Sequence, residues 1–130
     1  MGLFDSFKKR NEEDRFFEWL DSVLKTDLPN ETKAINFNIY EDTNNSWSIE
    51  LVAAFEFDEN DDDWACCEIF STRDKPFVIV RKSEWTKMEA MFIDWVNKYL
   101  YMGKYSDKLK QYQAVGLGFV DGILNILYKQ

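Results

Sequence analysis

Histidine is absent from this chain of 130 residues, and cysteine and proline occur only twice each. Without an imidazole the chain cannot form Ser-His or Cys-His nucleophilic systems, and it lacks the ligand on which most zinc sites depend. Cys66 and Cys67 are adjacent on a segment that we expect to be a strand, where successive side chains point to opposite faces. They are therefore not expected to bridge each other, and the absence of a disulfide framework is typical of a reducing compartment.

Long apolar runs are also missing, and the N-terminus has no apolar core of the kind found in signal peptides. We therefore expect a cytoplasmic protein with no membrane partner. Aromatic residues make up 17% of the chain and there are only five glycines, which excludes extensive disorder. The length favours one domain over residues 1–130, in which residues 1–11 form a terminal segment that can be flexible.

Basic residues are absent between Ala34 and Thr72, although ten acidic residues lie there. The whole chain carries a net charge of −8, so this middle third accounts for −10 and the remainder for +2. Phosphate binding requires a basic surface, and nucleic acid is therefore not an expected partner. The highest density of charge is a predicted loop with five carboxylates within six residues, which are Asp58, Glu59, Asp61, Asp62 and Asp63.

Apolar residues alternate with other residues from Trp47 to Phe57, which predicts a strand with one well-buried face. The acidic loop separates it from a second predicted strand over residues 64–70. Alternation over residues 34–40 predicts a further strand, which a polar turn rich in Asn and Asp joins to Trp47. Residues 77–80 are apolar at every position, so we expect a central strand covered on both sides.

Two helices are predicted from apolar residues that recur at steps of three and four. They cover residues 12–25 and residues 84–101, the second with Ser83 as its N-cap and Gly103 at its end. A short helical segment is expected over residues 106–112. The fold class is therefore α+β, with an antiparallel or mixed sheet of five or six strands packed against these two helices.

Asp121-Gly122 lies between two apolar runs, which predicts a terminal hairpin with a type I′ turn and Gly122 at positive φ. Gly116 and Gly118 lie on one face of the first strand of this hairpin, and they indicate the close approach of a helix or another backbone segment. A phosphate loop is excluded, because the spacing to Gly122 is wrong and no helix follows.

The acidic loop resembles a calcium-binding EF-hand loop at its first positions, Asp58, Asn60 and Asp62. However, Asp63 stands where the turn needs glycine, and Ile69 stands where a bidentate glutamate is needed. A nuclease of the Glu-x-Lys type fails as well, because no lysine follows Glu68 at the required spacing. We therefore predict no catalytic residue, no metal ligand and no cofactor, while an irregular cation site and a simply solvated loop remain alternatives to a binding surface.

The order of helix, sheet meander, long helix and hairpin, with the segments 47–57, 58–70 and 118–122, resembles small acidic domains among bacterial polymorphic-toxin immunity proteins and their uncharacterised relatives. The resemblance covers residues 34–130 and implies a cytoplasmic protein that binds and neutralises a toxin. The alternatives are an adaptor or regulatory binding domain and, third, a metal-dependent enzyme.

The expected partner is a basic protein, for example a nuclease toxin that must be positively charged where it binds phosphate. The partner-binding residues predicted for this surface comprise the acidic loop, two acids that extend it and one aromatic anchor: Asp58, Glu59, Asp61, Asp62, Asp63, Glu41, Asp42 and Trp64. The sequence leaves the oligomeric state open.

Overall fold

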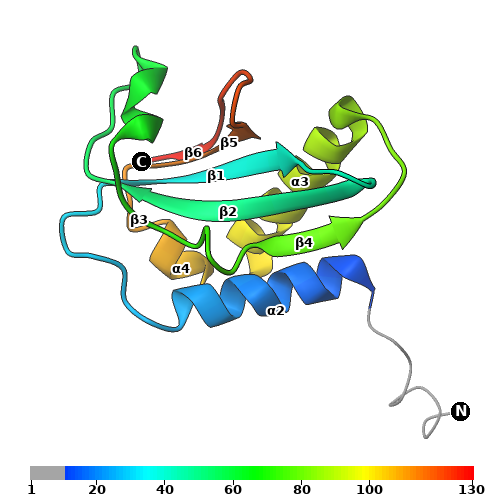
Figure 1. Cartoon of the computed structure of the whole chain (residues 1–130). Coiled ribbons are helices and arrows are strands. Elements are labelled where there is room, and N and C mark those ends of the chain that lie inside the picture. Colours follow the sequence, from blue (N-terminus) through cyan, green and yellow to red (C-terminus); the bar gives the residue numbers. More distant parts are fainter. Residues whose placement is uncertain (1–10) are drawn as a thin grey trace, which may run out of the picture.

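The protein has an α+β fold in a single small domain, in which a mixed six-stranded sheet packs against an N-terminal helix and a long helix (Figure 1). The computed structural model describes residues 11–130. The elements in chain order are α2 (Glu12–Leu24), β1 (Ala34–Glu41), β2 (Ser46–Ala54), the 3₁₀ helix η1 (Asp62–Cys66), β3 (Glu68–Ser71), β4 (Phe77–Val80), α3 (Trp85–Met102), α4 (Ser106–Leu109), β5 (Ala114–Phe119) and β6 (Asn125–Lys129).

The strand order is β3-β2-β1-β5-β6, and β4 also pairs with β2. Every pairing is antiparallel except that of β1 with β5, which is parallel. Strand β3 pairs with residues 52–54 of β2, and β4 pairs with residues 46–49, so the two short strands share one edge of β2. The chain crosses from this edge to the other side of β1 through α3 and α4.

Alternation along the strands divides the side chains between the two faces of the sheet. Ile35, Phe37 and Ile39 of β1 point into one core together with Phe16 of α2 and Phe92 of α3. The opposite face has a second, smaller core in which Trp64 of η1 packs on small residues, namely Ala34, Ala54 and Ala114. One face is therefore covered by the long helices, and the other by η1 and the loops beside it.

Local sequence explains where the helices begin and end. The side chain of Asn11 caps α2 by accepting a hydrogen bond from the backbone N–H of Asp14 at 2.8 Å, and three acids occupy the first turn, where the helix dipole favours them. The N-cap of α3 is Glu84, without a side-chain cap bond, so the expectation for Ser83 is wrong. Gly103 ends α3 as predicted.

The turn between β1 and β2 also follows from the sequence. Asn44 and Asn45 are at φ 59° and 58°, and the N–H of Ser46 donates to the carbonyl of Thr43. Both central residues of a type I′ turn need positive φ, which asparagine tolerates better than most residues. The predicted Asn-rich hairpin turn is therefore confirmed.

The second hairpin differs from its prediction. Strand β5 ends at Phe119 and β6 begins at Asn125, so five residues connect them, and no glycine of the described chain is at positive φ. The expected two-residue turn at Asp121-Gly122 is wrong, because the loop folds back over β5. A β-carbon on Gly118 would lie only 2.6 Å from the carbonyl oxygen of Ile123. This confirms the predicted close approach of another backbone segment.

Three strand predictions are corrected. Strand β2 ends at Ala54, which leaves Phe55 exposed outside it, and the segment predicted as a strand over residues 64–70 is a 3₁₀ helix followed by β3. Strand β4 lies at the edge of the sheet, with Val78 and Val80 exposed, because β3 and β4 divide one edge of β2 between them.

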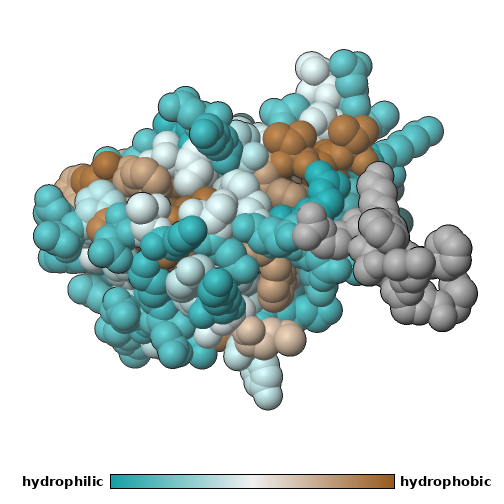
Figure 2. Space-filling view, turned by 90° about the horizontal axis from the view of Figure 1, so that it is seen from below, coloured by the Kyte–Doolittle hydropathy of each residue, from teal (hydrophilic) through white to brown (hydrophobic). Residues whose placement is uncertain are grey.

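The view from the side of α2 shows a mainly hydrophilic surface with scattered hydrophobic groups (Figure 2).

Within residues 11–130, none of the helices has the length and apolar character needed to cross a membrane. The expectation of flexibility for residues 1–11 falls, except for Asn11, on a segment outside the described residues.

Candidate functional site

The acidic loop leaves the sheet at the end of β2 and returns through η1. All five predicted carboxylates, Asp58, Glu59, Asp61, Asp62 and Asp63, are exposed. Two of them have a local structural role, since Asp58 accepts a hydrogen bond from the N–H of Asn60 at 2.9 Å, and Asp61 caps η1 by accepting one from Asp63 at 3.0 Å. These bonds hold the loop in one conformation.

Two bases, Lys129 and Arg73, form ion pairs with acids in or near this loop. Lys129 of β6 pairs with Glu59, and this contact lowers the pKa of the Glu59 carboxyl. Arg73 pairs with Glu68 at 2.7 Å and approaches Glu50 at 3.2 Å. Among the described residues, Asp58, Asp61, Asp62 and Asp63 form no ion pair. Within the loop of residues 58–63, Glu59 is therefore neutralised by Lys129, and the four aspartates are not.

The other predicted binding residues do not join this loop. Glu41 pairs with Trp47 at one end of the β1–β2 hairpin, whereas the loop begins at the other end, where Ala34 pairs with Ala54. Asp42 follows Glu41 and is exposed with it. Glu41 and the start of the loop after Ala54 thus lie at opposite ends of the eight-residue strand β1, roughly 20 Å apart.

Trp64 is only 2% exposed, because its ring inserts over the small residues of β1, β2 and β5. It makes an edge-to-face contact with Phe57 at 5.3 Å between ring centroids. The indole thus anchors η1, which carries Asp62 and Asp63, to the sheet. It does not present an aromatic surface to solvent.

Asp62 and Asp63 form one wall of a cavity of about 240 Å³ between η1 and the β5–β6 loop. Asn36 and Asn38 of β1 line it opposite, and parallel pairing places them beside Gly116 and Gly118 of β5. The two glycines keep this part of the sheet free of side chains, which is what makes room for the cavity and for the returning loop.

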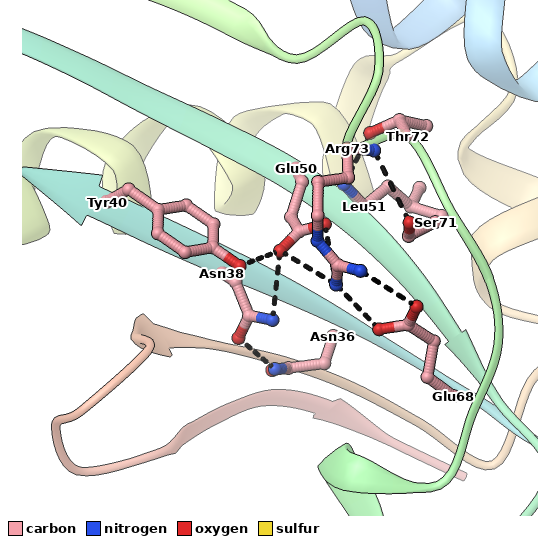
Figure 3. A network of polar contacts seen from close by, with 9 residues as sticks. All are labelled: Asn36, Asn38, Tyr40, Glu50, Leu51, Glu68, Ser71, Thr72 and Arg73. Carbon is pink, nitrogen blue, oxygen red and sulfur yellow. Dashed lines mark hydrogen bonds and ion pairs between the residues drawn. The ribbon is translucent and has the colours of Figure 1, made fainter. Parts of the chain in front are cut away.

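A polar network extends from this cavity along the sheet face that the long helices do not cover (Figure 3). The side chain of Glu50 is 1% exposed, and its carboxylate accepts hydrogen bonds from the hydroxyl of Tyr40 and from the amide of Asn38, the latter at 3.4 Å. Asn36 in turn donates to Asn38 at 2.8 Å. Arg73 reaches across from the β3–β4 turn to Glu50 and Glu68.

The orientation of these amides follows from the carboxylate. Paired with Arg73, Glu50 only accepts, so Asn38 presents its NH₂ group to Glu50 and its oxygen to Asn36. The oxygen of Asn36 is then left buried without a partner in the described chain. Burial, and after it the bond to Glu50, raises the pKa of the Tyr40 hydroxyl. The charged members of the network, Glu50, Glu68 and Arg73, pair with one another.

Residues 11–130 contain no group of three or more cysteine, aspartate or glutamate side chains placed to hold a metal ion. Cys66 and Cys67 are free thiols at the end of η1, and burial, reinforced by Glu56, raises the pKa of the Cys67 thiol. A raised pKa disfavours the thiolate, which is the reactive form of cysteine.

A second concave surface was not anticipated from the sequence. It has a volume of about 490 Å³ and lies between the start of α3, the end of β1 and the β5–β6 loop. Trp85 and Glu89 of α3, Glu41, Phe119, Asp121 and Ile123 are among its lining residues. Trp85 follows the helical period of the buried residues Met88 and Phe92, which predicts a buried side chain, but its position in the first turn of α3 leaves it 56% exposed. In the sequence, the groove is indicated only by an aromatic residue at the start of a helix with acidic residues nearby.

Comparisons with protein-family models, with curated proteins and with solved structures gave no match to this chain.

Proposed function

We propose that this protein is a non-catalytic binding module of the immunity type, which neutralises a basic bacterial toxin through its acidic surface in the cytoplasm. The observation that carries the proposal is the group of four aspartates on the loop before and within η1, exposed and without an ion pair in the described chain. Two of them, Asp62 and Asp63, stand on a helix that Trp64 anchors to the sheet.

The physical argument starts from repulsion. Like charges held at close spacing destabilise a fold slightly and make the local potential negative, which attracts a positive surface and raises the association rate. A toxin that degrades nucleic acid must be basic where it binds phosphate. An acidic surface on a preorganised loop can occupy that site in place of the substrate, and a fixed loop loses little conformational entropy on binding.

The test is co-expression with the product of the gene adjacent to the one that encodes this chain. An immunity protein should restore the growth of cells in which that product is toxic, and a neighbouring product that does not inhibit growth would count against the immunity proposal. The informative variant is Asp62→Lys with Asp63→Lys. It leaves Asp58 and Asp61, and therefore their loop-closing hydrogen bonds, in place.

The matched control is Asp74→Lys with Asp107→Lys, which changes the net charge by the same amount. Both acids are exposed and form no ion pair within the described chain, and they lie in the β3–β4 turn and in α4 rather than on the loop. The loop variant should lower the association rate with the toxin by about 10-fold or more at low salt and by much less at high salt. Equal effects of the two variants would show that only net charge matters.

A further inference from the structure

The groove beside Trp85 combines an exposed aromatic face with acidic residues. Trp85 lies at the start of α3, and its ring contacts Phe119 edge to face at 6.0 Å between centroids. Phe119 contacts the buried Trp47 in the same way at 6.2 Å. The exposed indole of Trp85 is therefore packed against Phe119, which in turn packs against Trp47 in the core. Because these contacts already restrict the indole, it loses little conformational entropy when a ligand binds.

The charge around the groove has one sign. Glu41, Glu89 and Asp121 line it, none of the lining residues is lysine or arginine, and the three carboxylates form no ion pair within residues 11–130. The start of α3 contributes a partial positive charge, but three full negative charges exceed the roughly half charge of a helix terminus. The groove thus offers carboxylate acceptors and an exposed indole, and Phe119 and Ile123 add apolar surface to its lining.

We propose that this groove receives an arginine side chain of the basic partner. The inference rests on the proposed function and deepens it, by naming the group that the partner inserts. A guanidinium stacks on an indole face and donates to carboxylates as a planar fork, while its aliphatic stem covers apolar surface. Lysine supplies the same charge without the plane or the fork. The groove volume of about 490 Å³ accommodates such a side chain together with flanking residues of the partner.

This site changes the predicted aromatic anchor. Trp64, the anchor expected from the sequence, is buried in the structure. Trp85 is exposed and lines the groove together with Glu41, one of the acids predicted to bind the partner. The groove and the cavity of Asp62 and Asp63 share Phe119 and Gly122 in their linings, so they flank the β5–β6 loop from two sides. A single basic surface can therefore contact both.

The test uses a blocked tetra-arginine peptide, with a blocked tetra-lysine peptide of equal charge as the comparison. The readout is the indole N–H signal of Trp85 in an NMR spectrum of the labelled protein, assigned by its loss in Trp85→Phe. Tetra-arginine should shift this signal and bind several-fold tighter than tetra-lysine. Trp85→Leu should weaken the arginine peptide by roughly 3- to 30-fold, the range expected from losing a cation–π contact.

The acidic rim is tested by Glu41→Gln with Asp121→Asn, against the equal-charge control Asp74→Asn with Asp107→Asn. The rim variant should weaken tetra-arginine binding and the control should not. Thermal unfolding checks that each variant is folded, which is expected because the substituted side chains are exposed. Peptide binding without a shift at Trp85, equal binding of both peptides, or equal effects of rim and control variants would overturn the proposal.

Failure of the groove and failure of the immunity function give different results. If the basic toxin binds, depends on Asp62 and Asp63 and leaves the Trp85 signal unmoved, the proposed function stands and the arginine site is refuted. If tetra-arginine binds at Trp85 as described but the chain protects no cell from its neighbour's product, the arginine site stands and the immunity function is refuted.

Discussion

The two faces of the sheet are buried by different means. On the face covered by α2 and α3, large rings interlock, since Trp95 contacts Phe16, Phe77 and Phe92 at centroid distances of 5.5, 6.3 and 5.4 Å. On the other face, three alanines and Gly116 lie beneath the ring of Trp64, and Gly118 lies beneath the β5–β6 loop. The first face is therefore buried by the close packing of large side chains. The second is buried because small residues let Trp64 and the β5–β6 loop approach the sheet closely.

The two faces also differ in the polar groups that they hold. The helix-covered face has no unneutralised carboxylate in its core, whereas the second face holds the buried Glu50 network, the cavity and the unpaired aspartates. The cavity that Asp62 and Asp63 line lies on this loop-covered face, whereas the groove beside Trp85 lies at the start of α3.

The largest expected effect is the loss of a ring from the helix-covered face. Trp95 is 6% exposed, and Trp95→Ala should lower the free energy of unfolding by about 3–5 kcal/mol, because the cavity cannot collapse among neighbouring rings. Urea denaturation measures this change. A loss below about 1 kcal/mol would mean that this face is not close-packed.

A smaller effect is expected when a methyl group is added to the other face. The new β-carbon of Gly118→Ala would meet the carbonyl oxygen of Ile123 at 2.6 Å, so the β5–β6 loop must shift, at a cost of about 1–3 kcal/mol. Gly122→Ala is the control, since its β-carbon meets its nearest neighbour at 3.3 Å and its φ is not positive. If both variants were equally stable, the loop would not be held against the sheet.

The two faces should also differ at high pH. Burial, and then the hydrogen bond to Asp21 at 2.6 Å, raises the pKa of Tyr99 on the helix-covered face, while Tyr40 on the other face is raised by burial and by Glu50. A raised folded-state pKa contributes stability that is complete below the unfolded value, about 10, and is lost as pH rises through the folded value.

The free energy of unfolding should therefore fall above about pH 10, by at most about 1.4 kcal/mol per pH unit for each tyrosine. Tyr99→Phe should reduce this slope more than Tyr40→Phe, because only Tyr99 is fully buried. Urea denaturation at a series of alkaline pH values measures the slopes. If Tyr40→Phe reduced the slope more than Tyr99→Phe, the stability of the loop-covered face would depend more strongly on alkaline pH than that of the helix-covered face.

The smallest effect is expected at the β1–β2 turn, which neither face buries. Asn44 is at positive φ, so Asn44→Ala should cost about 1 kcal/mol and Asn44→Gly should be nearly neutral. Thermal unfolding of the two variants measures the difference. If both variants lost much stability, the side chain of Asn44 would make stabilising contacts in addition to adopting positive φ. The turn could then not be used as a reference for the effects on the two faces.

The elements whose local pattern agrees with their surroundings could be predicted from the sequence. The helical stripe of Phe16 and Leu20, the alternation of Ile35, Phe37 and Ile39 and the Asn44-Asn45 turn all report short-range preferences, and the structure has each of them. The acidic loop could be placed in the chain for the same reason. Periods of three to four and of two residues are properties of the backbone itself.

Tertiary pairing decided the rest. An apolar run such as Phe77–Val80 does not state which strand it will pair with, and its place at an edge follows from β3 occupying the other part of β2. Likewise, Lys129 and Arg73 pair with acids that are 70 and 23 residues away along the chain, Glu59 and Glu50. Trp64 is buried because three alanines from three strands meet beneath it. The sequence by itself determined the two long helices, most of the strands, their order along the chain and the surplus of acid, because these depend on neighbours along the chain. Only the folded structure decided which acids stay unpaired and which tryptophan faces solvent, because burial and ion pairing depend on neighbours in space.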